Sequence, residues 1–66
     1  MNDPTQLLRI FLEENIIVQC KDMEPICCKL HAFDEHTNIL VTTNENKKDK
    51  AIFIRGETII LIKKCL

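Results

Sequence analysis

The chain has 66 residues, 45% of them hydrophobic, and it carries nine basic and ten acidic side chains. This length permits a single domain, residues 1–66, which buries only about 60% of the surface that its unfolded form exposes, so stabilising partner subunits are expected. The net charge of −1 excludes attraction to RNA or acidic lipid by an overall positive field, so any RNA contact must be local.

Targeting signals and cysteines indicate the cellular setting. No segment has the features of a signal peptide, and the longest apolar run, near residues 58–62, is too short to span a bilayer. We therefore expect a soluble, intracellular protein. The four cysteines, Cys20, Cys27, Cys28 and Cys65, are then expected to be reduced and to behave as small, often buried hydrophobic side chains, with disulfides or metal binding as the alternative.

The N-terminal segment has the pattern of a short helix over about residues 4–12. Asp3 is a suitable cap, Pro4 suits the first helical position, and Gln6 completes a capping-box pattern. Apolar residues follow at three- and four-residue spacing, which predicts that one face of the helix packs on an apolar surface. These residues are Leu7, Leu8, Ile10, Phe11 and Leu12.

After the helix, apolar residues recur at every second position instead of every third or fourth, which predicts strands. The even-numbered residues of 16–20 form the more buried face of the first strand. Pro25 cannot donate to a sheet ladder, so it is expected at the start of a second strand that extends through residues 26–33. In that strand Cys28, Leu30 and Ala32 are predicted to share one face.

The rest of the chain predicts three more strands. A polar interruption at 34–38 precedes a β-branched strand at 39–43, and the charge-dense residues 44–50 are expected to form a solvated loop. The continuous apolar runs at 51–54 and 58–62 are predicted to be strands buried on both faces. Such strands are exposed edges unless another subunit pairs with them. The sequence thus predicts one helix followed by five short antiparallel strands.

Two polar clusters, at 34–38 and 55–57, interrupt the apolar strands. Loops that follow neighbouring strands can lie at the same end of a small barrel, where their side chains converge. Taken singly, Asp34 and Asn38 are ordinary turn residues, and the Arg-Gly-Glu sequence at 55–57 is an ordinary hairpin corner.

Together and in this order, the two clusters resemble the two motifs of the Sm and Like-Sm family. Residues 32–40 contain an apolar strand, an Asp, two variable residues, an apolar residue and an Asn. Residues 53–60 contain Arg-Gly and an acidic residue between two apolar strands. The resemblance places the first motif at about 16–43 and the second at about 51–63. It implies a mainly β fold, in which a short N-terminal helix precedes a strongly bent five-stranded antiparallel sheet, a small Sm-like open barrel.

The resemblance also implies a function. Members of this family form rings, here expected to be hetero-heptameric, that bind uridine-rich single-stranded RNA. Residues 30–36 favour the Like-Sm branch, which implies U6-type small nuclear RNA in pre-mRNA splicing, messenger decay, and a location in the nucleus with a cytoplasmic share. Two alternatives remain: a core subunit of the Sm-D branch in spliceosomal ribonucleoproteins, and a structural ring subunit without a working RNA pocket.

The RNA-binding residues implied by the resemblance are Asp34, His36, Asn38, Arg55, Gly56 and Glu57. Their chemistry suits these roles. The imidazole ring of His36 and the guanidinium plane of Arg55 each offer a flat surface on which a base can stack. The Asn38 amide both donates and accepts, as the edge of a uracil requires.

The remaining residues of this site are expected to support its geometry. Asp34 would accept a hydrogen bond from the Asn38 amide or the loop backbone and so fix its orientation. Gly56 would let the backbone approach a base closely or turn with positive φ. Glu57, where the family more often has Asp, would pair with Arg55.

Metal binding and catalysis are weaker hypotheses. Besides the cysteines, His31 and His36 are potential ligands, but the adjacent Cys27 and Cys28 on a strand point to opposite faces, unlike the paired ligands of zinc ribbons. A thiol dyad of Cys28 or Cys20 with His31 is conceivable, but the chain lacks a phosphate loop and a nucleophile elbow. We therefore expect no catalytic residue, no metal, no cofactor and no membrane contact.

The sequence departs from the family pattern at two structural positions. The family usually has glycine in the turn after the first strand, where this chain has Asp22 or Met23, and within the bent second strand, where it has Cys28. A β-carbon at Cys28 is expected to restrict the sharpest bending of that strand.

Overall fold

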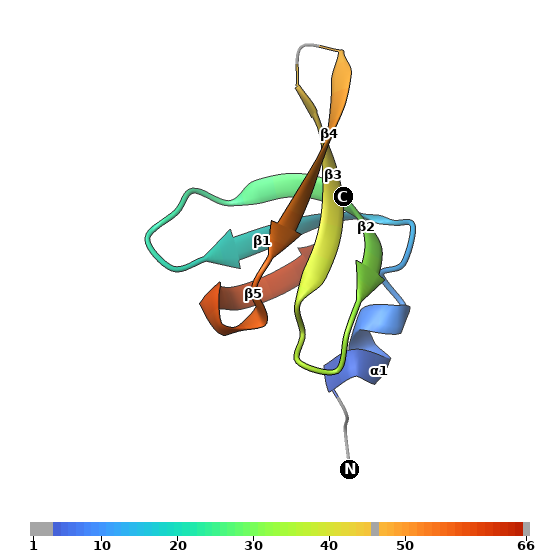
Figure 1. Ribbon diagram of the computed structural model, residues 1–66, viewed down its shortest axis with the longest axis vertical. Helices are drawn as coiled ribbons and strands as arrows, with labels where there is room; N and C mark the ends of the chain where they lie inside the picture. The colour runs from blue at the N-terminus through green and yellow to red at the C-terminus, as the bar shows by residue number, and fades with distance from the viewer. Residues whose placement is uncertain (1–3, 46, 66) are drawn as a thin grey trace.

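The computed structural model describes residues 4–45 and 47–65, which form one short helix, five strands and a 3-10 turn. In chain order these are α1 (Pro4–Arg9), β1 (Asn15–Cys20), β2 (Ile26–Phe33), β3 (Ile39–Glu45), β4 (Lys48–Ile54), η1 (Gly56–Thr58) and β5 (Ile59–Lys64). The strands form one antiparallel sheet in the order β4-β3-β2-β1-β5 (Figure 1). This confirms the predicted fold class. No helix within the described ranges is long and apolar enough to cross a bilayer.

Helix α1 ends at Arg9, three residues earlier than predicted. The backbone after the helix pairs with β2 instead. Leu12 forms a parallel bridge with Leu30, and the Glu13 N–H donates to the Leu30 carbonyl at 2.8 Å. Glu13 adopts φ 62°, which a helix cannot accommodate. The predicted cap, Asp3, lies outside the described residues.

The core lies between α1 and the inner face of the sheet. Its buried apolar members are Leu8, Ile16, Val18, Cys20, Cys28, Leu30, Ile39, Val41 and Ile54. The predicted alternation in β1 is confirmed, because each even-numbered residue of 16–20 is buried. The predicted apolar stripe of the helix was too broad: Leu8 is buried and Phe11 packs against the core, but Ile10 is 68% exposed.

Strand β2 is strongly bent (Figure 1), and the irregularity in its pairing lies at His31. Its register with β3 shifts between Leu30 and Ala32, which marks a β-bulge. After the bulge, the side chains of β2 point to the opposite face of the sheet from the one that the alternation predicts. Ala32 is therefore exposed, and the prediction that it shares a face with the buried Cys28 was wrong. A bulge bends a strand by itself. The curvature therefore does not need a glycine at Cys28.

The first turn also works without glycine. Asp22 lies between β1 and β2 with φ 57°. This left-handed region favours glycine but admits Asp and Asn more readily than other side chains. The family's usual glycine and this aspartate thus satisfy the same backbone requirement.

The segment of residues 44–50 is largely strand rather than the predicted loop, but Asn44 and residues 47–50 are exposed to solvent as predicted. Strand β3 continues to Glu45 and β4 begins at Lys48, so most of the segment is paired. The Asn44 amide Nδ2 donates to Asp49 Oδ1 at 3.0 Å across this pair. The two strands form a hairpin that projects beyond the rest of the sheet (Figure 1), and the charged residues of this segment extend the ladder.

Strands β4 and β5 are the two edges of the sheet. Within this single chain they are not buried on both faces as predicted, because Phe53 and Ile60 are each 62% exposed and Leu61 is also exposed. Edge strands with apolar side chains readily pair with another chain. The fold therefore presents two unsatisfied apolar edges on opposite sides of one sheet.

Candidate nucleic-acid interface

The two polar clusters meet in the structure. The turn between β2 and β3 contains Asn38, and the connection between β4 and β5 contains Gly56. The Gly56 N–H donates to Asn38 Oδ1 at 2.7 Å, across 18 positions of sequence. This bond joins the two loops at one end of the sheet, as the sequence analysis predicted.

Asp34 organises the first of these loops. Its Oδ1 accepts from the backbone N–H of His36 at 2.8 Å and of Asn38 at 3.0 Å, and its Oδ2 accepts from Asn38 Nδ2 at 2.9 Å. Thr37, at φ 66°, lets the chain reverse between these partners. The predicted orientation of the Asn38 amide by Asp34 is confirmed.

These hydrogen bonds make the loop sensitive to acid. The bond from the Asn38 amide, with those from the two backbone N–H groups, lowers the pKa of the Asp34 carboxyl below its ordinary value of 3.8. The folded-state pKa is therefore the lower one. The stabilisation is present above pH 3.8 and is lost as the pH falls through the folded pKa.

We expect the amide proton resonances of His36 and Asn38 to titrate together, with a midpoint below pH 3.8. Nuclear magnetic resonance spectra recorded over an acid series measure this midpoint. Asp34→Asn is the control, because it removes the carboxylate and should remove the step. A shared midpoint at or above pH 3.8 in the parent chain would contradict the carboxylate-centred loop.

Gly56 is required because of its contact with the first loop. A β-carbon placed on it would lie 2.2 Å from the His36 carbonyl oxygen and 2.8 Å from the Thr37 carbonyl carbon. Its φ is not positive. The predicted positive φ is therefore wrong, and the backbone of the other loop by itself excludes a side chain at this position.

Three side chains of the predicted site face solvent. Arg55 Nη2 and Glu57 Oε1 lie 3.1 Å apart, so the predicted pair forms with the longer Glu, and both side chains are about 70% exposed. The His36 side chain is 75% exposed, with Nε2 3.5 Å from Glu35 Oε1. The two planar groups are therefore accessible to a ligand.

Asn38 has a structural role beside its predicted role as a reader of the base edge. Both atoms of its amide are already engaged, since Oδ1 accepts from Gly56 and Nδ2 donates to Asp34. One N–H and one lone pair remain for a ligand. Its first role in the structure is to join the loops.

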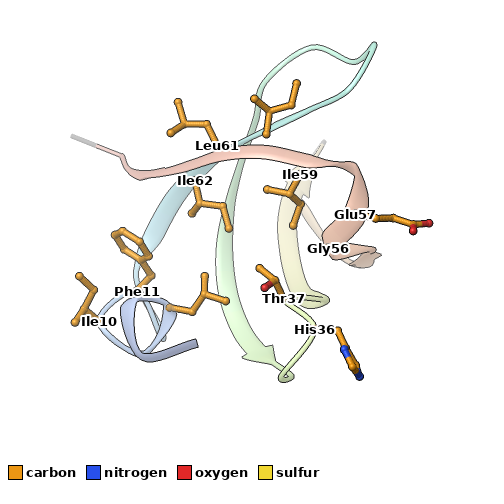
Figure 2. A pocket seen from close by; sticks show the side chains of 11 residues that line it. Ile10, Phe11, His36, Thr37, Gly56, Glu57, Ile59, Leu61 and Ile62 are labelled. Carbon is orange, nitrogen blue, oxygen red and sulfur yellow. The ribbon is translucent and has the colours of Figure 1, made fainter. Parts of the chain in front are cut away.

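A groove beside the two loops was not predicted (Figure 2). It has a volume of about 730 Å³ and lies between α1, β5 and the loops. Its lining is Leu8, Ile10, Phe11, His36, Thr37, Gly56, Glu57, Ile59, Ile60, Leu61 and Ile62. Ile59 and Ile62 point into it, whereas His36 and Glu57 point away at its rim (Figure 2). No local sequence signal could have found it, because the groove depends on the pairing of β5 with β1, two strands far apart in the sequence.

A short helix, a bent five-stranded antiparallel sheet and two loops joined through Asp34, Asn38 and Gly56 define a small protein of the Sm-like class. The sequence model of the LSM domain matches residues 6–64. The chain therefore belongs to the LSM domain family.

Relatives support this assignment. A probable U6 snRNA-associated Sm-like protein of Encephalitozoon cuniculi is 38% identical over 64 residues, covering 94% of this chain and 91% of that protein. The LSM complex subunit lsm3 of Schizosaccharomyces pombe is 30% identical, covering 91% and 86%. A probable U6 snRNA-associated Sm-like protein LSm3 of Dictyostelium discoideum is 29% identical, covering 94% and 84%. These names agree with the predicted Like-Sm branch rather than the Sm-D branch.

Solved structures share the fold. The P. aerophilum SmAP1 heptamer superposes with a TM-score of 0.79 at 19% identity, covering 100% of this chain and 97% of that chain. The Sm-like protein AF-Sm2 of Archaeoglobus fulgidus superposes with a TM-score of 0.78 at 24% identity, covering 98% and 97%. The predicted open-barrel architecture is thus that of known Sm-like proteins.

Proposed function

We propose that this chain, acting as one domain of residues 1–66, is an Sm-like ring subunit that binds uridine-rich single-stranded RNA. The observation that carries this proposal is the hydrogen bond of 2.7 Å between Gly56 and Asn38, which fixes two distant loops beside each other. It places the exposed planes of His36 and Arg55 on loops that are joined to one another. The U6 snRNA-associated relatives and the heptameric structural neighbours support the same class of function.

In this proposal each loop residue has a distinct task. A base stacks on the imidazole of His36 or the guanidinium of Arg55, and Glu57 holds the guanidinium in place. The remaining N–H and lone pair of Asn38 contact the base edge, while Asp34 fixes the amide. Gly56 completes the RNA-binding set by keeping the two loops in contact. The chain acts by binding rather than catalysis, and it needs no cofactor or metal.

The charges of the loops favour contact with bases over contact with phosphates. Asp34, Glu35 and Glu57 supply three carboxylates, against the one guanidinium of Arg55. Electrostatic attraction to phosphates comes from Lys and Arg side chains in excess of nearby carboxylates. Recognition by this subunit is therefore expected to be through stacking and the base edge.

Ring formation follows from the two exposed edges. Heterologous association places one surface of a subunit against a different surface of the next, and it closes into a ring when the rotation permits. Strands β4 and β5 are such a pair of different surfaces. A single stacking pocket binds weakly, and several pockets in one ring bind one strand more tightly, because each further contact is intramolecular.

The expected assembly is hetero-heptameric and nuclear, with a cytoplasmic share, and acts in pre-mRNA splicing on U6-type RNA and in messenger decay. The names of the relatives favour this over a core Sm-D-type subunit. A structural ring subunit without a working RNA pocket is the remaining alternative. RNA binding by defined variants separates it from the proposal.

We expect Arg55→Ala to weaken oligouridine binding by the assembled ring roughly 5- to 150-fold, because one stacking contact contributes about 1–3 kcal/mol. Fluorescence anisotropy with labelled oligouridine measures this change. Lys48→Ala is the matched control: it also removes one exposed cation, but from the far end of β4, and should change affinity little. Equal affinities for Arg55→Ala and the parent in an intact ring would identify the subunit as a structural spacer.

A further inference from the structure

Two cysteines far apart in sequence meet on the outer surface of the sheet. Cys27 Sγ and Cys65 Sγ lie 3.5 Å apart, although the residues are separated by 38 positions. Cys27 is exposed and Cys65 is half-buried. The cysteines were expected to be small, often buried hydrophobic side chains: Cys20 and Cys28 are buried, whereas Cys27 and Cys65 are accessible in part.

The strand pairing explains the meeting. Cys27 lies on β2 opposite Ile17 of β1, and Cys65 directly follows β5, which pairs with the other side of β1. The Cys65 N–H donates to the Asn15 carbonyl at 2.9 Å, which continues the β5 pairing past Lys64. The two thiols therefore approach each other from the two strands that flank β1.

We propose that Cys27 and Cys65 form a redox site, a dithiol that low-molecular-weight disulfides such as oxidised glutathione convert to an intramolecular disulfide. The Cys27 thiolate, the more exposed of the two, attacks one sulfur of glutathione disulfide, forms a mixed disulfide and releases one glutathione thiolate. The Cys65 thiolate then attacks the Cys27 sulfur and releases the second glutathione. Two electrons pass from the pair to glutathione, and the two thiol protons end on the two glutathione molecules.

The geometry favours an internal bond at this pair. The sulfurs must approach by about 1.5 Å to reach a disulfide length of about 2 Å. Cys65 follows the last residue of β5 and is held to β1 by the bond to Asn15, so closing the disulfide has to shift only this end of the pairing. Cys28, the neighbour of Cys27, is buried on the opposite face and is 4% exposed. The Cys28 thiol is therefore inaccessible to glutathione disulfide.

Oxidation of the Cys27–Cys65 pair is expected to be slow at neutral pH. The hydrogen bond with Cys65, with smaller contributions from desolvation and from charge on Cys65, raises the pKa of the Cys27 thiol above its ordinary value. Only the thiolate attacks a disulfide, so oxidation should accelerate as the pH rises. The product would join β2 covalently to the end of the β5 edge strand, across β1. This inference does not depend on RNA binding.

The test uses the full chain in glutathione redox buffers. Acid quenching, alkylation of remaining thiols and intact-mass measurement report the number of oxidised cysteines. We expect a product that has lost two hydrogens and keeps two alkylatable thiols after unfolding, formed faster at higher pH. Cys27→Ser should not form it.

Cys28→Ala is the matched control, because it removes the adjacent thiol on the opposite face, and it should still form the internal disulfide. Cys20→Ala serves the same purpose if the first control does not fold. Stable mixed disulfides or chain-to-chain dimers in place of the internal product would overturn the proposal. An internal disulfide that persists in Cys27→Ser would also overturn it.

Discussion

Gly56→Ala is expected to force the two loops apart and to abolish the contribution of this subunit to RNA binding. The new β-carbon would stand 2.2 Å from the His36 carbonyl oxygen, and the obstacle is backbone that cannot rotate away as a side chain would. Insertion of extra volume into a packed contact costs about 1–3 kcal/mol and sometimes more. We expect about 3 kcal/mol here, a large share of the stability of a domain this small.

Urea denaturation measures the loss in free energy of unfolding, and oligouridine binding measures the loss of the site. Glu57→Ala is the control for the urea measurement alone, because its side chain is largely exposed and its removal should leave the loops joined, whereas its contact with Arg55 belongs to the RNA site. If Gly56→Ala unfolded at the same urea concentration as the parent and bound RNA equally well, the inter-loop contact would not be important for the site.

Phe53→Asp and Ile60→Asp are each expected to prevent ring assembly. These side chains lie on the two edge strands, and each is 62% exposed in the single chain. In the proposed ring both become buried, and a buried carboxylate without a partner costs several kcal/mol. Since every subunit needs both edges, loss of either one should break the ring.

Native mass spectrometry and sedimentation of the chain with its partner subunits measure the assembly. Met23→Asp is the matched control: it places the same charge at a side chain that is 57% exposed, in the turn between β1 and β2, away from both edges. It should assemble normally. The ring proposal fails if the unsubstituted chain is a stable, cooperatively folded monomer at micromolar concentration.

Much of the architecture could be predicted because its signals are local. The recurrence of the buried residues at every second position of 16–20 specifies which face of β1 is buried, and Pro25 marks the start of β2. The apolar runs at 51–54 and 58–62 identified the strands that became the sheet edges. The contact between Asp34 and Asn38 was also predictable, since both residues belong to one short turn.

The features that were missed depend on residues distant in sequence. Helix α1 stops at Arg9 because the segment after it pairs with Leu30, which no helical pattern reveals. The bulge at His31 exposes Ala32 through its register with β3. Position 56 must be glycine because a side chain there would collide with the backbone of the other loop. That loop is distant in sequence: Asn38, to which Gly56 donates, is 18 positions away.

The position of β5 beside β1 has a consequence for the order of folding. The first strand, Asn15–Cys20, pairs on one side with Ile59–Lys64, so the sheet cannot be completed until β5 has been synthesised. Until then that side of β1 is an unpaired apolar edge, and pairing over such a separation is slow compared with local contacts. Loss of β5 would therefore leave a nascent chain open to aggregation at its first strand.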